Sequence, residues 1–259
     1  IQEKLKCLDK ESITMVYGGI CGKIVAAICI CFSLFQIYTG IFGTLDAMIQ
    51  RCVHLSFGIC LVFLLCPTKK SWVKGGRFHP LDLLLTVLAV IPPLYILVNY
   101  QQLILRAGTV TPTDAVVGLL GIVMVLEAAR RIVGLPIVIV VLCFLAYGFL
   151  GPYMPGPLAH RGLTINQMVG HLFFTTEGVF GIPLGVSSTF IFLFILFGAY
   201  LEKTGLGKFF IDIANALAGW ASGGPAKVAV ISSALQGTIS GSSLANVVGS
   251  GSFTIPMMK

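Results

Sequence analysis

Charged side chains are scarce in this sequence. Asp, Glu, Lys and Arg make up 10% of its 259 residues, whereas a soluble domain usually carries about 25%. Hydrophobic residues supply 56%, and the mean hydropathy is +0.96. The shortage of charge excludes an ordinary soluble domain. It predicts an all-α membrane protein with several spans, because a helix satisfies its own backbone hydrogen bonds in lipid.

Catalytic and metal-binding motifs are missing as well. There is no G-x-x-x-x-G-K-[ST] loop, so nothing suggests ATP hydrolysis. A serine hydrolase needs a histidine base near its nucleophile. No histidine follows His171, and the four histidines (54, 79, 160 and 171) are expected in or near loops or at a helix end. The eight cysteines form no CxxC pair. We therefore predict no enzyme, no cofactor, no metal cluster and no nucleic-acid partner.

Apolar runs predict six transmembrane helices, because about 20 apolar residues cross a bilayer. The expected spans are residues 23–42, 45–66, 81–99, 115–127, 135–150 and 183–201. The fourth is short unless its helix continues through Val133. The chain begins at Ile1 rather than Met and stops just after the last apolar arm, so we expect it to be an N-terminal fragment.

The basic residues predict the orientation in the membrane. With a cytoplasmic N-terminus, the outer loops hold only Arg51, Arg106 and Arg161. The other 14 basic residues fall inside, at positions 4, 6, 10, 23, 69, 70, 74, 77, 130, 131, 203, 208, 227 and 259. Cytoplasmic loops carry such an excess of Lys and Arg, so the net charge of +7 reports topology, with the N-terminus on the cytoplasmic side.

Two amphipathic stretches are expected to lie along the membrane surface. Residues 163–180 fall outside, where His171 could contact a partner or rest in the interface. Residues 208–220 form a helix too short to span, expected in the plane of the cytoplasmic surface. Of the acids near the spans, Asp82 suits the start of a helix. Glu127 is either a functional intramembrane acid or the partner of Arg130 and Arg131.

The last apolar segment, residues 223–259, predicts a re-entrant helical hairpin. Its first arm, residues 225–237, is about 20 Å long, too short for a hydrocarbon core of about 30 Å. The arm ends at the Gly/Ser-rich run 238–243. Broken backbone at membrane depth must line a cavity or be buried in protein, so this run is either an ion and anion site or a tight helix contact.

Five stretches of the chain resemble permeases of the tripartite ATP-independent periplasmic (TRAP) transporters. They are residues 126–131 (LEAARR), 180–188 (FGIPLGVSS), 223–230 (GGPAKVAV), 237–248 (GTISGSSLANVV) and 251–259 (GSFTIPMMK). The resemblance is closest to fused small-plus-large permeases that work with TAXI-type periplasmic binding proteins. It implies that residues 1–131 are a small-subunit-like four-helix scaffold. Residues 132–259 would begin the large-subunit transport domain of an elevator-type fold.

The resemblance also implies a function and a site. It implies Na⁺-coupled import of small organic acids that a TAXI-type periplasmic binding protein delivers. Ser240, Gly241 and Ser242 would give oxygen ligands to Na⁺, and Ser242, Ser243 and Asn246 would face the substrate. Two alternatives stay open at this point. One is a non-transporting membrane scaffold in which the hairpin only packs, and the other is an elevator transporter of another ion-coupled family.

Overall fold

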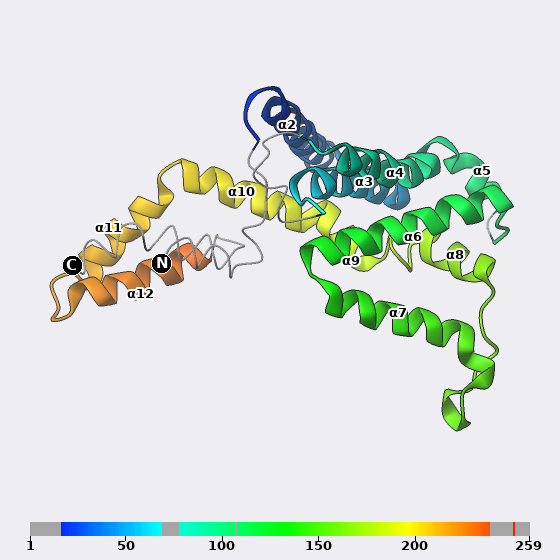
Figure 1. The fold of residues 1–259 in the computed structure, drawn as a ribbon. Coiled ribbons are helices and arrows are strands. Elements are labelled where there is room, and N and C mark those ends of the chain that lie inside the picture. The colour runs from blue at the N-terminus through cyan, green and yellow to red at the C-terminus, as the bar shows by residue number, and fades with distance from the viewer. Residues whose placement is uncertain (1–16, 69–77, 107, 239–250, 252–259) are drawn as a thin grey trace. The chain divides into compact units, whose positions relative to one another are not determined.

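The computed structural model describes residues 17–68, 78–106, 108–238 and 251, and in these residues all regular structure is helical (Figure 1). The chain divides into two compact units, one ending at Ser188 and one beginning at Thr189. The first unit contains α2 (Gly19–Phe42), α3 (Ala47–Leu65), α4 (Pro80–Val98), α5 (Tyr100–Leu105), α6 (Pro112–Ile132), α7 (Leu135–Leu150), the 3₁₀ turns η3 (Gly151–Tyr153) and η4 (Gly156–Leu158), α8 (Ile165–Phe173) and α9 (Ile182–Val186). A π-helical turn, η5 (Ser187–Ile191), crosses the boundary, and the second unit continues with α10 (Phe192–Lys203), α11 (Leu206–Ala218) and α12 (Gly224–Gly237).

Five helical segments of the described chain are long and apolar enough to cross a membrane. They are Gly19–Phe42, Ala47–Leu65, Pro80–Val98, Leu135–Tyr153 and Ile182–Leu201. The prediction of an all-α membrane protein is therefore confirmed. The remaining expected span, 115–127, lies inside α6, whose 21 residues extend about 31 Å. An acidic side chain stands in the first turn of α6 and two basic side chains stand in its last turn, so the apolar stretch between them is shorter than the helix.

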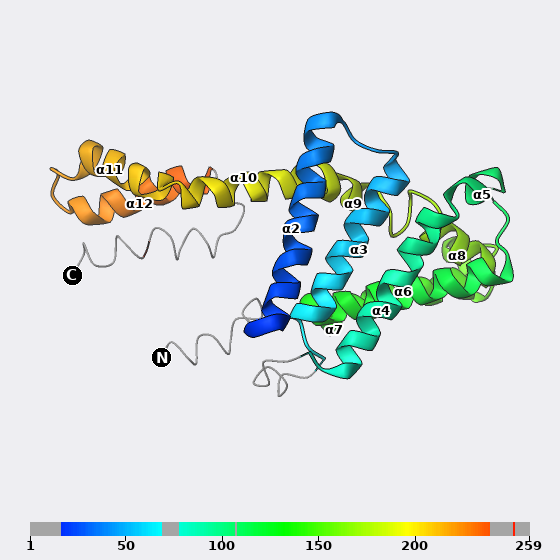
Figure 2. The same ribbon diagram turned by 90° about the horizontal axis from the view of Figure 1, so that it is seen from above.

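The core of the first unit lies where α3, α4 and α6 meet (Figure 2). One cluster of buried apolar side chains includes Met48, Cys52, Ile96, Ile122 and Phe173. A second cluster on the same helices comprises Ile59, Phe63, Ala89, Met124 and Ala128. Helix α2 packs on α3, and α8 packs on α6. Within the segment 163–180, which was predicted to be amphipathic, residues Ile165–Phe173 form the nine-residue helix α8, whose Met168, Val169 and Phe173 are buried.

The packing of α8 on α6 depends on two glycines. A Cβ atom at Gly121 would collide with the ring of Phe173, and one at Gly118 would lie 2.9 Å from the ring of Phe174. Phe173 is fully buried. Helices approach closely where small residues leave room, so these glycines set the distance between the two helices.

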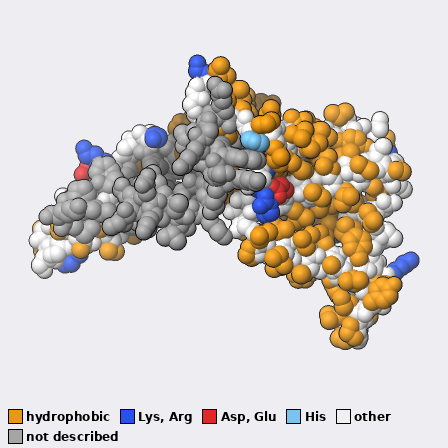
Figure 3. Space-filling model, viewed as in Figure 1, with side chains coloured by type: hydrophobic (Ala, Val, Ile, Leu, Met, Phe, Trp, Pro, Cys, Tyr) orange, Lys and Arg blue, Asp and Glu red, His pale blue; other side chains and the backbone are white. Residues whose placement is uncertain are grey.

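Helix α7 buries none of its side chains. It contacts α6 and the turn η3, and its large apolar residues, such as Phe144 at 71% relative exposure, face outward. In Figure 3 hydrophobic side chains cover most of the described surface around this helix. A helix that is apolar on all sides is suited to lipid or to further protein within a membrane.

The second unit is built around the α11–α12 pair. Ile211 and Ala214 of α11 pack against Val228 of α12, and all three are buried. A helix is observed at the predicted place as α11, and apolar side chains on its other face, such as Phe209 and Leu217, are exposed. Because Asp212 is also exposed, α11 presents both an apolar and a polar surface outside its contact with α12.

Candidate functional site

The predicted ion and substrate residues, Ser240, Gly241, Ser242, Ser243 and Asn246, lie outside the described residues. The described chain includes the helix that leads to them. Helix α12 has 14 residues, or about 21 Å, and ends at Gly237, the predicted end of the first arm. A helix of this length covers about two thirds of a hydrocarbon core.

The turn between α11 and α12 is tight. Gly223, the N-cap of α12, has φ +74°, a left-handed conformation that glycine adopts without a Cβ penalty. A Cβ at Gly224 would collide with the carbonyl oxygen of Gly219. Inside the pair Ser232 is buried, and its hydroxyl donates to the Ala229 carbonyl at 3.3 Å. The glycines therefore fix the direction in which α12 starts.

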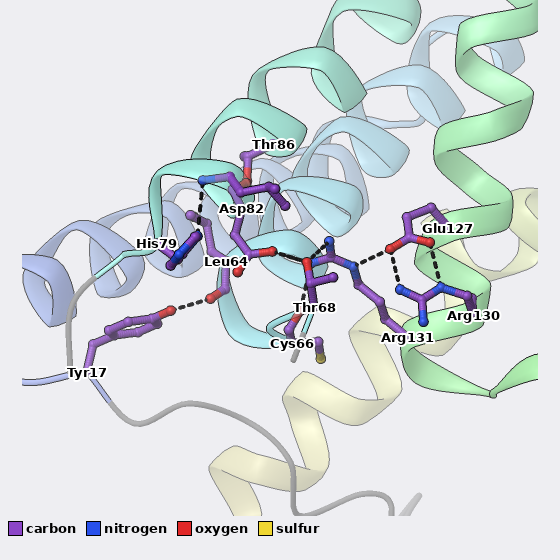
Figure 4. Close-up of polar contacts among 11 residues, drawn as sticks. Tyr17, Leu64, Cys66, Thr68, His79, Asp82, Thr86, Glu127, Arg130 and Arg131 are labelled. Atoms are coloured by element: carbon purple, nitrogen blue, oxygen red, sulfur yellow. Dashed lines mark hydrogen bonds and ion pairs between the residues drawn. The ribbon is translucent and has the colours of Figure 1, made fainter. Parts of the chain in front are cut away.

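A charged cluster joins the end of α3, the start of α4 and the end of α6 (Figure 4). Arg131, only 2% exposed, donates through Nη1 to the Cys66 carbonyl at 2.8 Å and to Asp82 Oδ1 at 2.9 Å. Its Nη2 donates to Thr68 Oγ1 at 2.7 Å, and its Nε donates to Glu127 Oε1 at 3.0 Å. The guanidinium also lies over the Phe63 ring, 4.4 Å from its centroid.

Glu127 completes this cluster on the α6 side. It accepts from Arg130 Nε and Nη2, both at 2.7 Å, in addition to Arg131. The predicted ion pair between Glu127 and the arginines is therefore confirmed. Asp82 occupies the first turn of α4, as predicted, but its partner Arg131 was not foreseen. Because two acids face two arginines with their hydrogen bonds made, the cluster acts as a structural clamp.

Cys66 and Tyr17, at the edge of the clamp, are partly buried. Burial raises the pKa of the Cys66 thiol, while Arg131 acts in the opposite direction. Burial and the neighbouring Asp82 raise the pKa of Tyr17, whose hydroxyl donates to the Leu64 carbonyl at 2.7 Å. Since the thiolate is the reactive form of cysteine, burial lowers the reactivity of the Cys66 thiol.

A second polar cluster lies among α2, α3 and the residues that follow α9. Gln36 Nε2 is 2.6 Å from His54 Nδ1, and His54 Nε2 is 3.2 Å from Ser187 Oγ. Gln50 Nε2 donates to Thr39 Oγ1 at 3.2 Å and to the Ser188 carbonyl at 3.0 Å. All of these except Ser187 are buried. The expectation that His54 lies near a loop or a helix end is wrong, because it occupies the interior of α3.

A third cluster surrounds Asp114 at the first turn of α6. This carboxylate, 1% exposed, accepts from the Tyr95 hydroxyl at 2.6 Å, from Thr111 and from Arg106 Nη2 at 3.3 Å. Thr111 and Asp114 form a capping box, the pairing that stabilises a helix start. Nearby, Asp46 caps α3, and the hydrogen bond from Tyr100 lowers the pKa of Asp46. The Tyr100 pKa rises to about 12 because the phenol is desolvated.

Sequence reasoning missed most of these partners. The sequence could have indicated that Gln36, Gln50 and His54 have partners, because polar side chains inside apolar runs are costly in a membrane unless paired. It could also have indicated the role of Asp114, since T-x-x-D before an apolar run resembles a capping box. Nothing in the sequence indicates the pairing of Asp82 with Arg131, because 49 residues separate them. Among the described residues, no group of three or more His, Cys, Asp or Glu could hold a metal ion.

The helices and clusters together define a polytopic all-α membrane protein with a short helical arm leading into a Gly/Ser-rich run. Residues 120–259, more than half of the chain, match the family described as DctM: Tripartite ATP-independent periplasmic transporter, DctM component. The chain therefore belongs to this family of TRAP transporter permeases, which is a transporter family and not an enzyme family. No curated protein and no solved structure matches the chain.

Membership of this family establishes the general function of the chain. The chain is a multi-pass membrane component of a TRAP transporter, and the family implies a small-molecule substrate and a periplasmic binding protein as partner. The match begins inside α6 and takes in α7 to α12 as well as the predicted hairpin run.

Proposed function

We propose that the protein imports small organic acids together with Na⁺, using a re-entrant hairpin at residues 223–259. The observation that carries this proposal is the family match across α11, α12 and the Gly/Ser-rich run that follows. Helix α12 is too short to cross the bilayer and ends where that run begins. An interrupted helix at membrane depth offers carbonyl and hydroxyl oxygens to a cation and a helix N-terminus to an anion.

The site roles follow from this arrangement. Ser240, Gly241 and Ser242 supply oxygens to Na⁺, which takes hard oxygen ligands. Ser242, Ser243 and Asn246 face the carboxylate of the substrate. Both ends of the hairpin face the cytoplasm of a bacterial inner membrane, with the chain's N-terminus on the same side. This orientation follows from the excess of Lys and Arg in the inner segments.

The proposal extends to subunits and partners. Residues 1–131 correspond to the small subunit and residues 132–259 to the start of the large subunit, fused in one chain of elevator type. The family match reaches back to residue 120, so it includes the second half of α6 with the large-subunit side. The binding protein that delivers the substrate is of the TAXI type, as the resemblance of the hairpin residues implies.

An uptake assay tests the function. The transporter, assembled with its binding protein in proteoliposomes, is given a panel of radiolabelled organic acids with and without an inward Na⁺ gradient. We expect uptake of at least one acid to need both the gradient and the binding protein. The double variant Ser243→Ala/Asn246→Ala should reduce this uptake at least tenfold, since it removes polar contacts with a charged ligand. Ser222→Ala, an exposed serine before α12, is the matched control and should transport normally.

Three results would count against parts of the proposal. Uptake that is equal with and without the Na⁺ gradient would exclude Na⁺ as the coupling ion and favour an elevator transporter of another ion-coupled family. Normal uptake by the double variant would contradict the assignment of Ser243 and Asn246 to the substrate site. No uptake of any acid by a correctly inserted assembly would favour a non-transporting scaffold.

The orientation has its own test. Cysteines placed at Lys227 and Lys259, in a background without the eight native cysteines, should react with a membrane-impermeant thiol reagent only from the cytoplasmic side. Labelling of either position from the periplasm would contradict the re-entrant hairpin.

A further inference from the structure

A cavity of about 460 Å³ opens in the first unit between α4, α5, α6 and α8. Much of its wall is apolar and includes Met48, Ile96, Leu103, Ile104 and Phe174. Helix α3 begins, α4 ends and α6 begins beside it. Since α3 and α4 are candidate membrane spans, a cavity beside the start of one and the end of the other lies where the hydrocarbon core of the membrane gives way to lipid headgroups.

Arg106 brings hydrogen-bond donors to this cavity. Its Nη2 contacts Asp114, but its Nε has no partner among the described residues, although that atom is buried. Asp114 also accepts hydrogen bonds from Tyr95 and Thr111. Its contact with Arg106 uses one of the five N–H donors of the guanidinium. The side chain is 32% exposed, and it therefore has donors to offer to a ligand.

The rest of the polar rim is also suited to an acceptor ligand. Asn166 and Gln167 of α8 line the cavity beside Arg106. The Gln167 side-chain oxygen accepts from the Thr164 backbone N–H at 3.0 Å, which leaves its amide NH₂ group for another partner. A phosphate diester offers only acceptors, and Arg binds it well. The apolar wall at the same site requires a ligand that also carries a hydrocarbon chain.

We propose that this cavity binds one glycerophospholipid, with its phosphate against Arg106 and one acyl chain along Leu103 and Ile104. The negative charge of Asp114 offsets that of Arg106, so the site recognises the phosphate through hydrogen bonds and accepts both zwitterionic and anionic headgroups. This inference concerns the α4–α6–α8 region and does not depend on the transport mechanism proposed for the hairpin.

Lipid titration of the purified, delipidated protein tests the proposal. Native mass spectrometry would count bound molecules while dioleoylphosphatidylglycerol is added. Ile104→Trp fills the cavity from a position that is 52% exposed, so it should fold normally. Arg106→Gln removes the charge but keeps a donor for Asp114. Leu105→Trp is the matched control, because Leu105 is 87% exposed and is not part of the cavity wall.

We expect one tightly held phospholipid per wild-type chain. Its affinity should fall about tenfold in Arg106→Gln, the loss typical of one charge-assisted hydrogen bond, and more in Ile104→Trp. Leu105→Trp should bind as wild type. Dioleoylglycerol, which lacks the phosphate, should bind at least tenfold more weakly than the phospholipid.

Each contrary result is decisive. Equal binding by Ile104→Trp and Leu105→Trp would show that the lipid sits elsewhere. Equal affinity for dioleoylglycerol would exclude recognition of the phosphate. Binding of inorganic phosphate alone, with no gain from the acyl chains, would replace the lipid by a free anion. Thermal unfolding of each variant shows that it is folded, and Ile104→Trp decides the matter if Arg106→Gln unfolds.

Discussion

Arg131 Nη1 lies 2.9 Å from Asp82 Oδ1, so a salt bridge joins the last turn of α6 to the first turn of α4. Both side chains are almost fully buried, at 2% and 7% relative exposure. Arg131 also holds the Cys66 carbonyl at the end of α3. One guanidinium thus fixes three helix ends, and its loss would leave the buried Asp82 carboxylate without a cation.

Adjacent arginines in α6 should differ sharply in their effect on stability. Arg131→Gln leaves Asp82 and part of Glu127 unpaired, and breaking a buried ion pair costs about 3–5 kcal/mol. Arg130→Gln removes a pair whose arginine is 36% exposed, and such pairs contribute about 1 kcal/mol or less. Thermal unfolding in detergent measures both. A melting temperature that falls equally in the two variants would contradict the clamp.

The buried contact of Gln36 with His54 should behave as a coupled pair. Gln36→Leu alone leaves an imidazole nitrogen without this partner inside a membrane helix, at a cost of about 1–3 kcal/mol. Replacing both residues by Leu removes donor and acceptor together, so the double variant should lose less stability than the two single variants combined. A double-mutant cycle on unfolding free energies gives the coupling. Strict additivity would mean that the 2.6 Å contact contributes nothing.

Two glycines, one in α6 and one in α3, should respond differently to replacement by alanine. Gly121→Ala places a methyl group against the Phe173 ring and should destabilise the α6–α8 contact by about 1–3 kcal/mol, the usual cost of overpacking. Gly58→Ala in α3 meets nothing within 4 Å and should be neutral or gain up to about 1 kcal/mol from helix propensity. Melting temperatures of the two variants check this. A destabilised Gly58→Ala together with an unaffected Gly121→Ala would refute the packing argument.

The Asp46–Tyr100 contact should make stability depend on pH at the acid end. The hydrogen bond from Tyr100 lowers the pKa of Asp46 in the folded protein, so the folded state favours the ionised form. Its contribution is present above the unfolded pKa of about 4 and is lost as pH falls through the lower, folded value. The melting temperature of the wild type should therefore fall more steeply between about pH 5 and pH 3 than that of Asp46→Asn.

Further variants separate the role of Asp46 as a helix cap from its hydrogen bond with Tyr100. Asn still caps a helix, so Asp46→Asn keeps the start of α3, whereas Asp46→Ala should cost a further 1 kcal/mol or so. Tyr100→Phe removes the hydrogen bond and should make the melting temperature fall less steeply at acid pH, as Asp46→Asn does. Melting temperatures that fall equally steeply at acid pH in the wild type, Asp46→Asn and Tyr100→Phe would contradict the proposed contact.

Much of the fold was open to prediction, because hydropathy reports membrane burial directly. The helix expected at 135–150 is observed with those bounds, and the others begin or end within a few residues of the predicted limits. Helix α6 extends further at both ends than the predicted span 115–127. Its capping box and its buried charges stabilise turns that an apolar window leaves out.

The polar clusters were harder to foresee, since they depend on which helices are neighbours. Glu127 and its arginines are three and four residues apart on one helix, so their pairing follows from helical spacing. The contacts of Arg131 with Asp82, and of Gln50 with Ser188, join separate helices, and no spacing rule reaches them. The π-helical turn at Ser187–Ile191 also has no signal in hydrophobic periodicity. The predicted site residues, from Ser240 to Asn246, remain predictions.

The clamp around Arg131 has a practical consequence for protein engineering. Thr68 is anchored through Arg131 and Asp82, and His79 accepts a hydrogen bond from the Leu81 backbone N–H at the start of α4. The chain is thus secured on both sides of residues 69–77. A small epitope or fluorescent label inserted between these anchors should leave the α3–α4–α6 core in place and give a reporter on the assembled transporter.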